Sequence, residues 1–484
     1  MNQLSLPHQY VDRPLSAPRI DRILFYTERV RQLALTGAPG TRRIQIDPSL
    51  VHDILRGLKN RPLFPRLKVL ELAFAINDGN IVPPLLSGIY LFFSETLQTV
   101  KLSVSQPPNL LHIPSIAMFI HDLAERTLPR NFKSFQADFK LSADILGPLM
   151  HLKRVEVLQF PMTRANALDL TTIQSLLVDK SLIQVLYISH GPSTIIFPPK
   201  KQKKNYPAKA TIDELRTLSL GSDTQIAPKF FSSFSFPQLQ CLQIFFRCSD
   251  VGAWPSKQIW DDLFFQITES SSAICGLWLH LGENSISVGN GATQNATPPL
   301  LLWQSLKPLL QLQNLTKVKI QGPKVRCFMD DDFFDLVQAW PRLEELALET
   351  EGEPSITHAS LLTIAIYLPK LKSLTVNNIN LEHAHPSALP EEVIDSVLPD
   401  HPLTKIYISE RQWPHNAPLA GPVNVPLVEH PFNLAQFLDM LFPSLCTLNL
   451  ERIRFHPHVG RSDVWDFIVG LQAARKREKT KSGL

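Results

Sequence analysis

A six-residue pattern of aliphatic side chains, L-x-x-L-x-L, recurs along nearly the whole of this 484-residue chain. Other apolar residues replace leucine at some positions, and one copy, around Phe132 and Phe135, matches poorly. Successive copies begin 23 to 42 residues apart. A single copy says little, but a long series at quasi-regular spacing indicates a repeat architecture. The good copies begin at Val30, Leu67, Leu97, Val155, Ile183, Leu215, Leu239, Ile274, Leu315, Leu343, Leu371, Leu403 and Leu445.

The spacing within the pattern predicts a strand. Its second and third aliphatic positions are two residues apart, so on a strand they point to the same side. One such strand cannot bury its inner face alone, whereas stacked neighbours form a parallel sheet with a continuous core. The segments Asp331–Trp340, Ser360–Leu368 and Leu434–Leu441 have helical spacing between these strands. The sequence therefore predicts an α/β leucine-rich-repeat solenoid, a horseshoe with about ten to fourteen inner parallel strands and outer helices.

An apolar residue followed by proline often stands just before a predicted strand. Proline ends the preceding helix and favours an extended start to the strand, and the residue before it can fill the corner between them. The chain holds 40 prolines against 19 glycines, which agrees with many short elements. The pairs are Phe64-Pro65, Phe236-Pro237, Trp340-Pro341, Leu368-Pro369 and Phe442-Pro443.

The predicted organisation has three parts: an irregular segment 1–20, a solenoid 21–461 with insertions near 190–211 and 283–299, and a capping helix with a basic tail, 462–484. The first helix is expected near Ile20–Val30. The segment Ser462–Arg475 reads as an amphipathic helix that covers the last repeat at Leu445. Its expected buried stripe is Val464, Phe467, Ile468, Leu471 and Ala474.

We expect Asp330 to cap the helix predicted over Asp331–Trp340. Phe334, Leu336, Val337 and Trp340 should then share a face. The acidic triplet 330–332 could also suggest a cation site, but acidic residues at a helix start are equally explained by capping and the helix dipole.

Three stretches carry a resemblance to a family: Asp21–Leu35, Ile46–Leu72 and Trp465–Ala474. They are similar to F-box/leucine-rich-repeat proteins of mushroom-forming fungi, and the repeat style agrees. The resemblance implies a substrate-recognition region of a cullin-based ubiquitin ligase. In that family an F-box precedes the segment similar to Asp21–Leu35, and it docks onto the ligase adaptor.

Here only residues 1–20 precede that segment, and prolines interrupt them. We therefore expect adaptor binding only if an F-box is supplied. The alternative is a free-standing leucine-rich-repeat protein, an inhibitor or nuclear scaffold, with no link to ubiquitination.

The sequence indicates no chemistry of its own. It contains no G-x-x-x-x-G-K-[ST], H-E-x-x-H or G-x-S-x-G motif, so we expect no enzyme, cofactor or metal. The five cysteines lack metal-site spacing and are expected to be reduced core residues. A net charge of +4 points to neither nucleic acid nor membrane, and no apolar run approaches the ~18 residues of a membrane span. A cytoplasmic or nuclear location is expected.

The candidate binding residues lie on the concave face of the predicted sheet, with the loops as the rival surface. Aromatic and charged side chains are what a recognition surface would carry, since Trp and Tyr are enriched among interface hot spots. The concave candidates are Tyr187, Trp278, Lys317, Lys319, Glu345, Glu349, Lys405 and Tyr407. A lysine cluster in a proline-flanked insertion is a candidate nuclear-import peptide or a solvated loop: Lys200, Lys201, Lys203 and Lys204.

Overall fold

A computed structural model of the chain arranges its repeats in two compact units, Met1–Tyr206 and Pro207–Leu484. The boundary lies within the insertion that the sequence predicts near 190–211. The structure describes residues 17–36, 58, 62–74, 92–104, 113–126, 131–138, 147–149, 151–152, 155–162, 177, 183–190, 209–222, 226–247, 256–282, 300–321, 324–326, 329–349, 356–376, 379–381, 383–388, 401–408, 427–428, 430–450, 454–455 and 461–481.

Each repeat contributes one strand to a parallel ladder, and the poorly matching copy contributes β4. The α/β solenoid architecture predicted from the sequence is thereby confirmed. Among the described residues the first unit contains β1 (Gln32–Thr36), β2 (Val69–Phe74), β3 (Thr99–Val104), β4 (Ser134–Ala137), β5 (Val157–Met162) and β6 (Val185–His190), paired in this order. In the second unit the order is β8 (Thr217–Ser222), β10 (Cys241–Arg247), β11 (Gly276–Gly282), β13 (Lys317–Gln321), β15 (Glu345–Glu349), β17 (Ser373–Val376), β19 (Lys405–Ile408) and β21 (Thr447–Leu450).

The register stacks equivalent aliphatic positions of successive repeats on one another. In the second unit Leu242 lies opposite Leu218 on one side and Leu277 on the other. All three are fully buried. Leu448, on the last strand, is only partly buried. That strand has a described sheet neighbour on one side only, so the end of the ladder needs another cover.

One backbone carbonyl per repeat sets this register where each strand begins. The Cys275 carbonyl accepts from two consecutive amides of the next repeat, those of Thr316 at 2.7 Å and Lys317 at 3.1 Å. A shared acceptor leaves no room for a slip of one residue, which would move the aliphatic side chains to the other face. The same arrangement recurs at the carbonyls of Arg31, Lys68, Gln98, Lys133, Glu156, Arg216, Gln240, Thr316, Glu344, Lys372 and Thr404.

The corners before the strands are filled as the proline pairs predict. Trp340, Leu368 and Phe442 each follow the last residue of a helix and are almost wholly buried. Each carbonyl accepts from the amide of the leucine that opens the next pattern, at 3.0–3.1 Å. The Phe236 carbonyl likewise accepts from the Leu239 amide, at 3.1 Å. The residue before proline therefore both plugs the corner and turns the chain into the strand.

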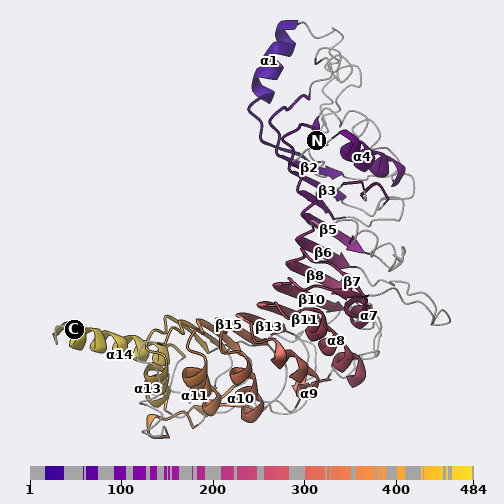
Figure 1. Cartoon of the computed structure of the whole chain (residues 1–484). Helices are drawn as coiled ribbons and strands as arrows, with labels where there is room; N and C mark the ends of the chain where they lie inside the picture. The colour runs from indigo at the N-terminus through magenta and orange to yellow at the C-terminus, as the bar shows by residue number, and fades with distance from the viewer. Residues whose placement is uncertain are drawn as a thin grey trace, which may run out of the picture. The chain divides into compact units, whose positions relative to one another are not determined.

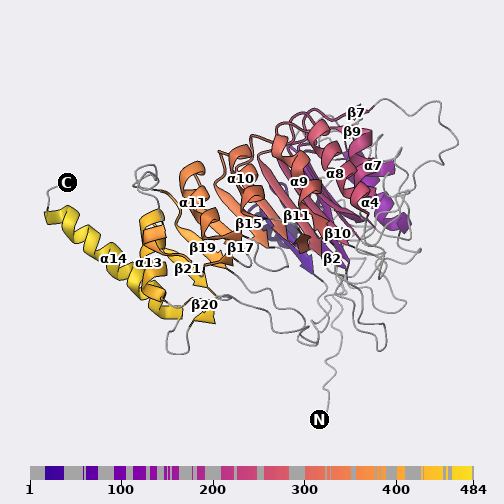
Figure 2. The same ribbon diagram turned by 90° about the horizontal axis from the view of Figure 1, so that it is seen from below.

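Helices cover one face of the second-unit strands. Those up to α13 (Pro431–Leu441) follow one another in series on the same side of the strands, and α14 (Arg461–Lys481) lies next to α13 at the end of the series (Figures 1 and 2). Their bounds are α7 (Ile226–Ser233), α8 (Lys257–Ser270), α9 (Trp303–Leu306), the 3-10 helix η2 (Lys307–Gln311), α10 (Asp330–Ala339), α11 (His358–Tyr367), the 3-10 helix η3 (Pro386–Ala388), α13 (Pro431–Leu441) and α14 (Arg461–Lys481). The described helices of the first unit of four or more residues are α1 (Ala17–Thr27) and α4 (Ile113–Arg126).

Short parallel strand pairs lie outside the main ladder of the second unit. Each joins segments from neighbouring repeats and so adds a second connection between them. The pairs are β7 (Ala210–Thr211) with β9 (Phe234–Ser235), β12 (Leu300–Leu302) with β14 (Lys324–Arg326), β16 (Ile356–Thr357) with β18 (Ile379–Asn380), and β20 (Leu427–Val428) with β22 (Arg454–Phe455).

The start of α10 differs from the sequence prediction. Asp330 is the first residue of the helix, not its cap, and the Met329 amide donates to the carboxylate of Asp332. Asp330 accepts instead from the amide and hydroxyl of Thr357, both at 2.8 Å. Its carboxylate thus ties α10 to the start of the next helix, a contact that helical spacing within one repeat does not reveal. The buried aromatic residue of α10 is Phe333, not Phe334 as the sequence predicted. The ring of Phe334 packs edge-on against Tyr367 instead.

Helix α14 packs against α13 and reaches the last repeat through the Gln472 amide, which donates to the Leu445 carbonyl at 2.9 Å. Val464 and Ile468 are fully buried, but Phe467 is 40% exposed and Ala474 is also exposed. The expected stripe is therefore rotated. The reason is that α14 packs mainly against α13, and this contact brings Arg475 onto the carboxylate of Asp439.

Removing the Arg475 side chain should destabilise the second unit. The Asp439 carboxyl is buried, which raises its pKa, and the Arg475 guanidinium opposes that effect. Without the guanidinium the carboxylate loses its charged partner, so Arg475→Met should cost about 1–3 kcal/mol of unfolding free energy. Urea denaturation followed by circular dichroism measures this. Arg477→Met, an exposed change on the same helix, is the control and should have little effect.

His401 provides a second buried polar contact, inside the core of the second unit. Its imidazole is fully buried and packs edge-on against Phe442. One ring nitrogen, Nε2, lies 3.0 Å from the Leu368 carbonyl, and the other, Nδ1, accepts from the Leu403 amide at 3.2 Å. A neutral ring protonated on Nε2 satisfies both bonds, whereas a second proton would face the Leu403 N–H. Burial lowers the pKa of His401.

The stability of the second unit should therefore fall in mild acid. Folding lowers the pKa of this histidine below its value in the unfolded chain, about 6.5. Above that pH the histidine is neutral in both states, so the free energy of unfolding is not reduced. As the pH falls below that value, the unfolded chain takes up the proton first. Thermal melting from pH 7.5 to 5 should show a smaller loss in His401→Gln than in the native protein. An equal slope in both proteins would contradict this, and His385→Gln, at an exposed position, should retain the native slope.

Candidate partner-binding face of the second unit

The second-unit sheet has one face toward the helices and one face away from them, here called the open face. Side chains on β13 and β17 alternate between buried and partly exposed positions. The buried positions are the stacked aliphatics, so the partly exposed ones form the open face. The register aligns them in rows. The first row is Thr217, Cys241, Gly276, Lys317, Glu345, Ser373, Lys405 and Thr447, and the second is Ser219, Gln243, Trp278, Lys319, Ala347, Thr375, Tyr407 and Asn449.

The sequence-predicted binding residues divide between the two units. Tyr187 lies on β6 of the first unit, opposite Gln159. Trp278, Lys317, Lys319, Glu345, Lys405 and Tyr407 belong to the two rows of the second unit. Glu349 lies at the end of β15 opposite Gln321, and its side chain is outside the described part. The cluster Lys200, Lys201, Lys203 and Lys204 also lies outside the described residues.

The indole of Trp278 lies close to the backbone of Gly276, the residue two positions before it on the same strand. A Cβ atom at Gly276 would stand 2.8 Å from Cζ3 and 3.0 Å from Cη2 of the indole. Those distances are shorter than van der Waals contact, so any other residue at 276 would displace the ring. The partly exposed indole on the open face is here called the platform. On the neighbouring strand Lys317 lies opposite Gly276, and Lys319 lies opposite Trp278.

Three side chains beside this platform escaped the sequence prediction. Phe245, 40% exposed, packs against His280, with ring centroids 5.8 Å apart. The Nδ1 atom of His280 lies 3.2 Å from Oε1 of Gln321. These residues form a third row, one step beyond the six-residue pattern. The signal that could have found them is the alternation itself, which continues from Ile244 to the buried Phe246 and so places Phe245 on the open face.

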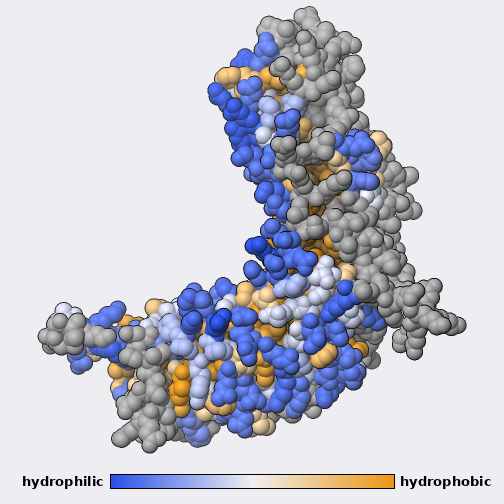
Figure 3. Space-filling model, viewed as in Figure 1, coloured by the Kyte–Doolittle hydropathy of each residue, from blue (hydrophilic) through white to orange (hydrophobic). Residues whose placement is uncertain are grey.

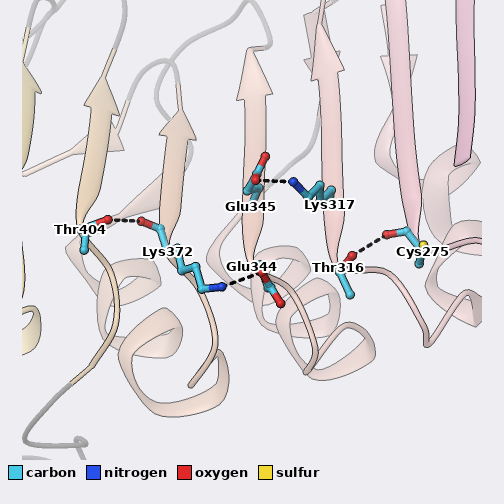
Figure 4. Close-up of polar contacts among 7 residues, drawn as sticks. All are labelled: Cys275, Thr316, Lys317, Glu344, Glu345, Lys372 and Thr404. Carbon is cyan, nitrogen blue, oxygen red and sulfur yellow. Dashed lines mark hydrogen bonds and ion pairs between the residues drawn. The ribbon is translucent and has the colours of Figure 1, made fainter.

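Ion pairs join neighbouring strands of the second unit near the amino-terminal ends of these strands (Figure 4). Lys317 and Glu345 meet at 2.6 Å, and Lys372 and Glu344 at 2.8 Å. The hydrogen bond and charge of Glu345 raise the pKa of Lys317, while those of Lys372 lower the pKa of Glu344. The Thr404 hydroxyl bonds the Lys372 carbonyl at 3.1 Å, and Thr316 bonds Cys275 in the same way.

Positive charge predominates on the described open face of the second unit. Here the residues directly before the strands are called the rim: Arg216, Gln240, Cys275, Thr316, Glu344, Lys372, Thr404 and Cys446. Together with the two rows, the rim carries two described acidic side chains, Glu344 and Glu345. The described basic side chains are Arg216, Lys317, Lys319, Lys372 and Lys405.

Three of the cysteines are not core residues as the sequence suggested. Cys241 lies in the first row and Cys275 and Cys446 lie in the rim, all free and at least partly exposed. They occupy pattern positions that point away from the core. Burial and the neighbouring Cys275 raise the pKa of Cys241.

Within the described ranges no group of three or more His, Cys, Asp or Glu side chains is arranged to hold a metal ion. No helix in the same part of the chain has the length and apolar character needed to cross a membrane.

Comparison with known proteins gives distant structural likenesses. No family model matches the chain, and no curated protein matches it. One similar solved structure is the leucine-rich repeat-containing protein LegL7 from Legionella pneumophila, at 12% identity, 91% coverage of this chain, 98% of that chain and a TM-score of 0.31. Another is the Rad7 and Elc1 complex in yeast, at 9% identity, 92% and 87% coverage and a TM-score of 0.35. The fold described above rests on the strands and their register.

The open-face ion pairs should contribute little to stability. The side chains of Lys317 and Glu345 are 44% and 52% exposed, and solvent-exposed pairs contribute less than about 1 kcal/mol. We therefore expect Lys317→Met to change the free energy of unfolding by less than that amount in urea denaturation. Leu346→Ala, at the buried position next to Glu345, should cost about 2–5 kcal/mol in the same measurement. A large loss for Lys317→Met would make the pair a structural element.

Proposed function

We propose that this protein is a non-enzymatic scaffold that binds another protein through the open face of its second unit. The observation that carries the proposal is the aromatic platform of Trp278 and Phe245 beside the lysine side chains of β13, on the sheet face that points away from the described helices. Aromatic residues with large contact areas dominate the binding energy of many protein interfaces. A face built on paired strands also changes little on binding, which limits the entropy cost.

The ladder supports this role because it holds neighbouring side chains at fixed spacing. Strands in a sheet lie about 4.8 Å apart. Gln243, Trp278 and Lys319 are in register on three consecutive strands, so they present one continuous surface. The loops between strands remain the rival surface for partner binding.

At a finer level, we propose a substrate-recognition region of a cullin-based ubiquitin ligase, acting in the cytoplasm or nucleus. The similarity of Asp21–Leu35, Ile46–Leu72 and Trp465–Ala474 to F-box/leucine-rich-repeat proteins supports this. The alternative is a free-standing inhibitor or nuclear scaffold with no link to ubiquitination. Cullin-ligase subunits bound to the purified protein would separate the two.

Site-specific photo-crosslinking tests the proposed face. A photoreactive amino acid at Tyr407 on the open face should capture a discrete partner in cells, identified by mass spectrometry. The matched position is Phe265, an exposed aromatic residue on α8 at the helical side, where the same partner should not be captured. Capture at Phe265 but not at Tyr407 would place binding on the helical side and contradict the proposal. Ligase subunits that co-purify would support the finer function.

A further inference from the structure

Two free cysteines occupy neighbouring positions where β10 and β11 begin. Cys241, in the first row, lies opposite Gly276 of β11, and Cys275 is the residue directly before Gly276. The Cys275 thiol is directed toward the preceding repeat, since its Sγ atom lies 3.3 Å from the carbonyl oxygen of Gln240, the residue before Cys241. The two cysteines are therefore diagonal neighbours across consecutive strands.

The spacing of this pair suits a disulfide bond. Neighbouring strands lie about 4.8 Å apart and rise about 3.3 Å per residue, so the Cα atoms of diagonal neighbours are about 6 Å apart. Disulfides join Cα atoms that are about 4.4–6.8 Å apart. The backbone holds this spacing, because the Gln240 carbonyl accepts from the amides of Cys275 at 2.8 Å and Gly276 at 2.9 Å. A disulfide can therefore form without a shift of either strand.

Both thiols are accessible from solvent. Cys241 and Cys275 are partly exposed, whereas the adjacent Leu242 and Ile274 are fully buried. Redox-active cysteines are accessible and often stand beside a second cysteine that completes a disulfide. Cys446 is also exposed, but it stands before β21, and the strands β13, β15, β17 and β19 lie between it and β11. Cys446 therefore serves as the internal reference for an accessible cysteine away from this pair.

We propose that Cys241 and Cys275 form an oxidisable dithiol site, which a peroxide converts to a disulfide between two consecutive repeats. This inference goes beyond the proposed function and holds whatever partner the open face binds. The disulfide would lie next to the platform, because the indole of Trp278 is close to Gly276. Oxidation at this site therefore alters the surface around Trp278.

The oxidation takes place in two balanced steps. First, the Cys275 sulfur attacks one oxygen of hydrogen peroxide, the O–O bond breaks, and the other oxygen leaves as water with the thiol proton. The Cys241 sulfur then attacks the sulfur of the resulting sulfenic acid, the S–O bond breaks, and a second water leaves with the Cys241 proton. The two cysteines lose two electrons and the peroxide gains them. Burial and the neighbouring Cys275 raise the pKa of Cys241, so we assign the first attack to Cys275.

Peroxide treatment of the full-length protein tests the site. The reduced protein is incubated with excess hydrogen peroxide, the remaining thiols are alkylated with iodoacetamide, and a tryptic digest is analysed by mass spectrometry without reduction. Trypsin cleaves after Arg247 and Lys257, so Cys241, Cys248 and Cys275 fall on different peptides. The expected product is a pair of peptides joined through Cys241 and Cys275, two hydrogen atoms lighter than the separate peptides. Dithiothreitol should restore both thiols.

Serine variants separate the two steps. In Cys241→Ser the disulfide should be lost, and Cys275 should remain as a sulfenic acid that dimedone traps. In Cys275→Ser the disulfide should also be lost. The matched control, Cys446→Ser, removes an exposed cysteine away from the pair and should form the disulfide as the native protein does. Circular dichroism spectra that match the native protein would show that each variant folds.

Several results would overturn the inference. One is a disulfide from Cys241 or Cys275 to another cysteine in place of the expected pair. Another is a native protein in which both thiols are still alkylated after excess peroxide. A sulfenic acid that persists on Cys275 while Cys241 is present would also contradict it, because the second thiol would then be out of reach.

Discussion

The structure depends on a backbone carbonyl shared between consecutive repeats. One acceptor receives two neighbouring amides of the next strand, as Cys275 does from Thr316 and Lys317. This bond sets the register of the strand, and register decides which side chains enter the core. The stacked aliphatics then bury one another from repeat to repeat. The corner residues Trp340 and Leu368 return each helix to the position from which the next strand can start.

Because register is fixed in this way, the position of a residue within the repeat determines its physical role. Aliphatic positions supply the core, and the positions between them are free to vary in chemistry without loss of packing. The open face can therefore hold a tryptophan, a lysine or a glutamate on consecutive strands. The visible surface of the second unit is largely hydrophilic, with apolar side chains in separate patches (Figure 3). A recognition surface can be assembled on such a ladder one side chain at a time.

Charged groups serve two different purposes in the second unit. Asp330 accepts from Thr357 in the next repeat, and Asp439 is buried beside Arg475 of the last helix. These carboxylates connect elements, and their partners are needed because an unpaired buried charge is costly. Lys317 and Glu345 are exposed and meet across two strands of the open face. Such a pair orients side chains on the surface and contributes little to folding.

Much of the fold could be read from the sequence, because a period of two residues decides which side of a strand each side chain takes. The thirteen good copies and the poor one at Phe132 all became ladder strands, and the apolar-proline pairs at Trp340, Leu368 and Phe442 became buried corners. The same alternation pointed to Trp278 and Lys317. Only the tertiary structure decided that Trp278 lies over Gly276, that Phe245 and His280 stand beside it, and that Asp330 bonds the following helix. Those contacts depend on rotamers and on the approach of separate repeats, which a local pattern does not encode.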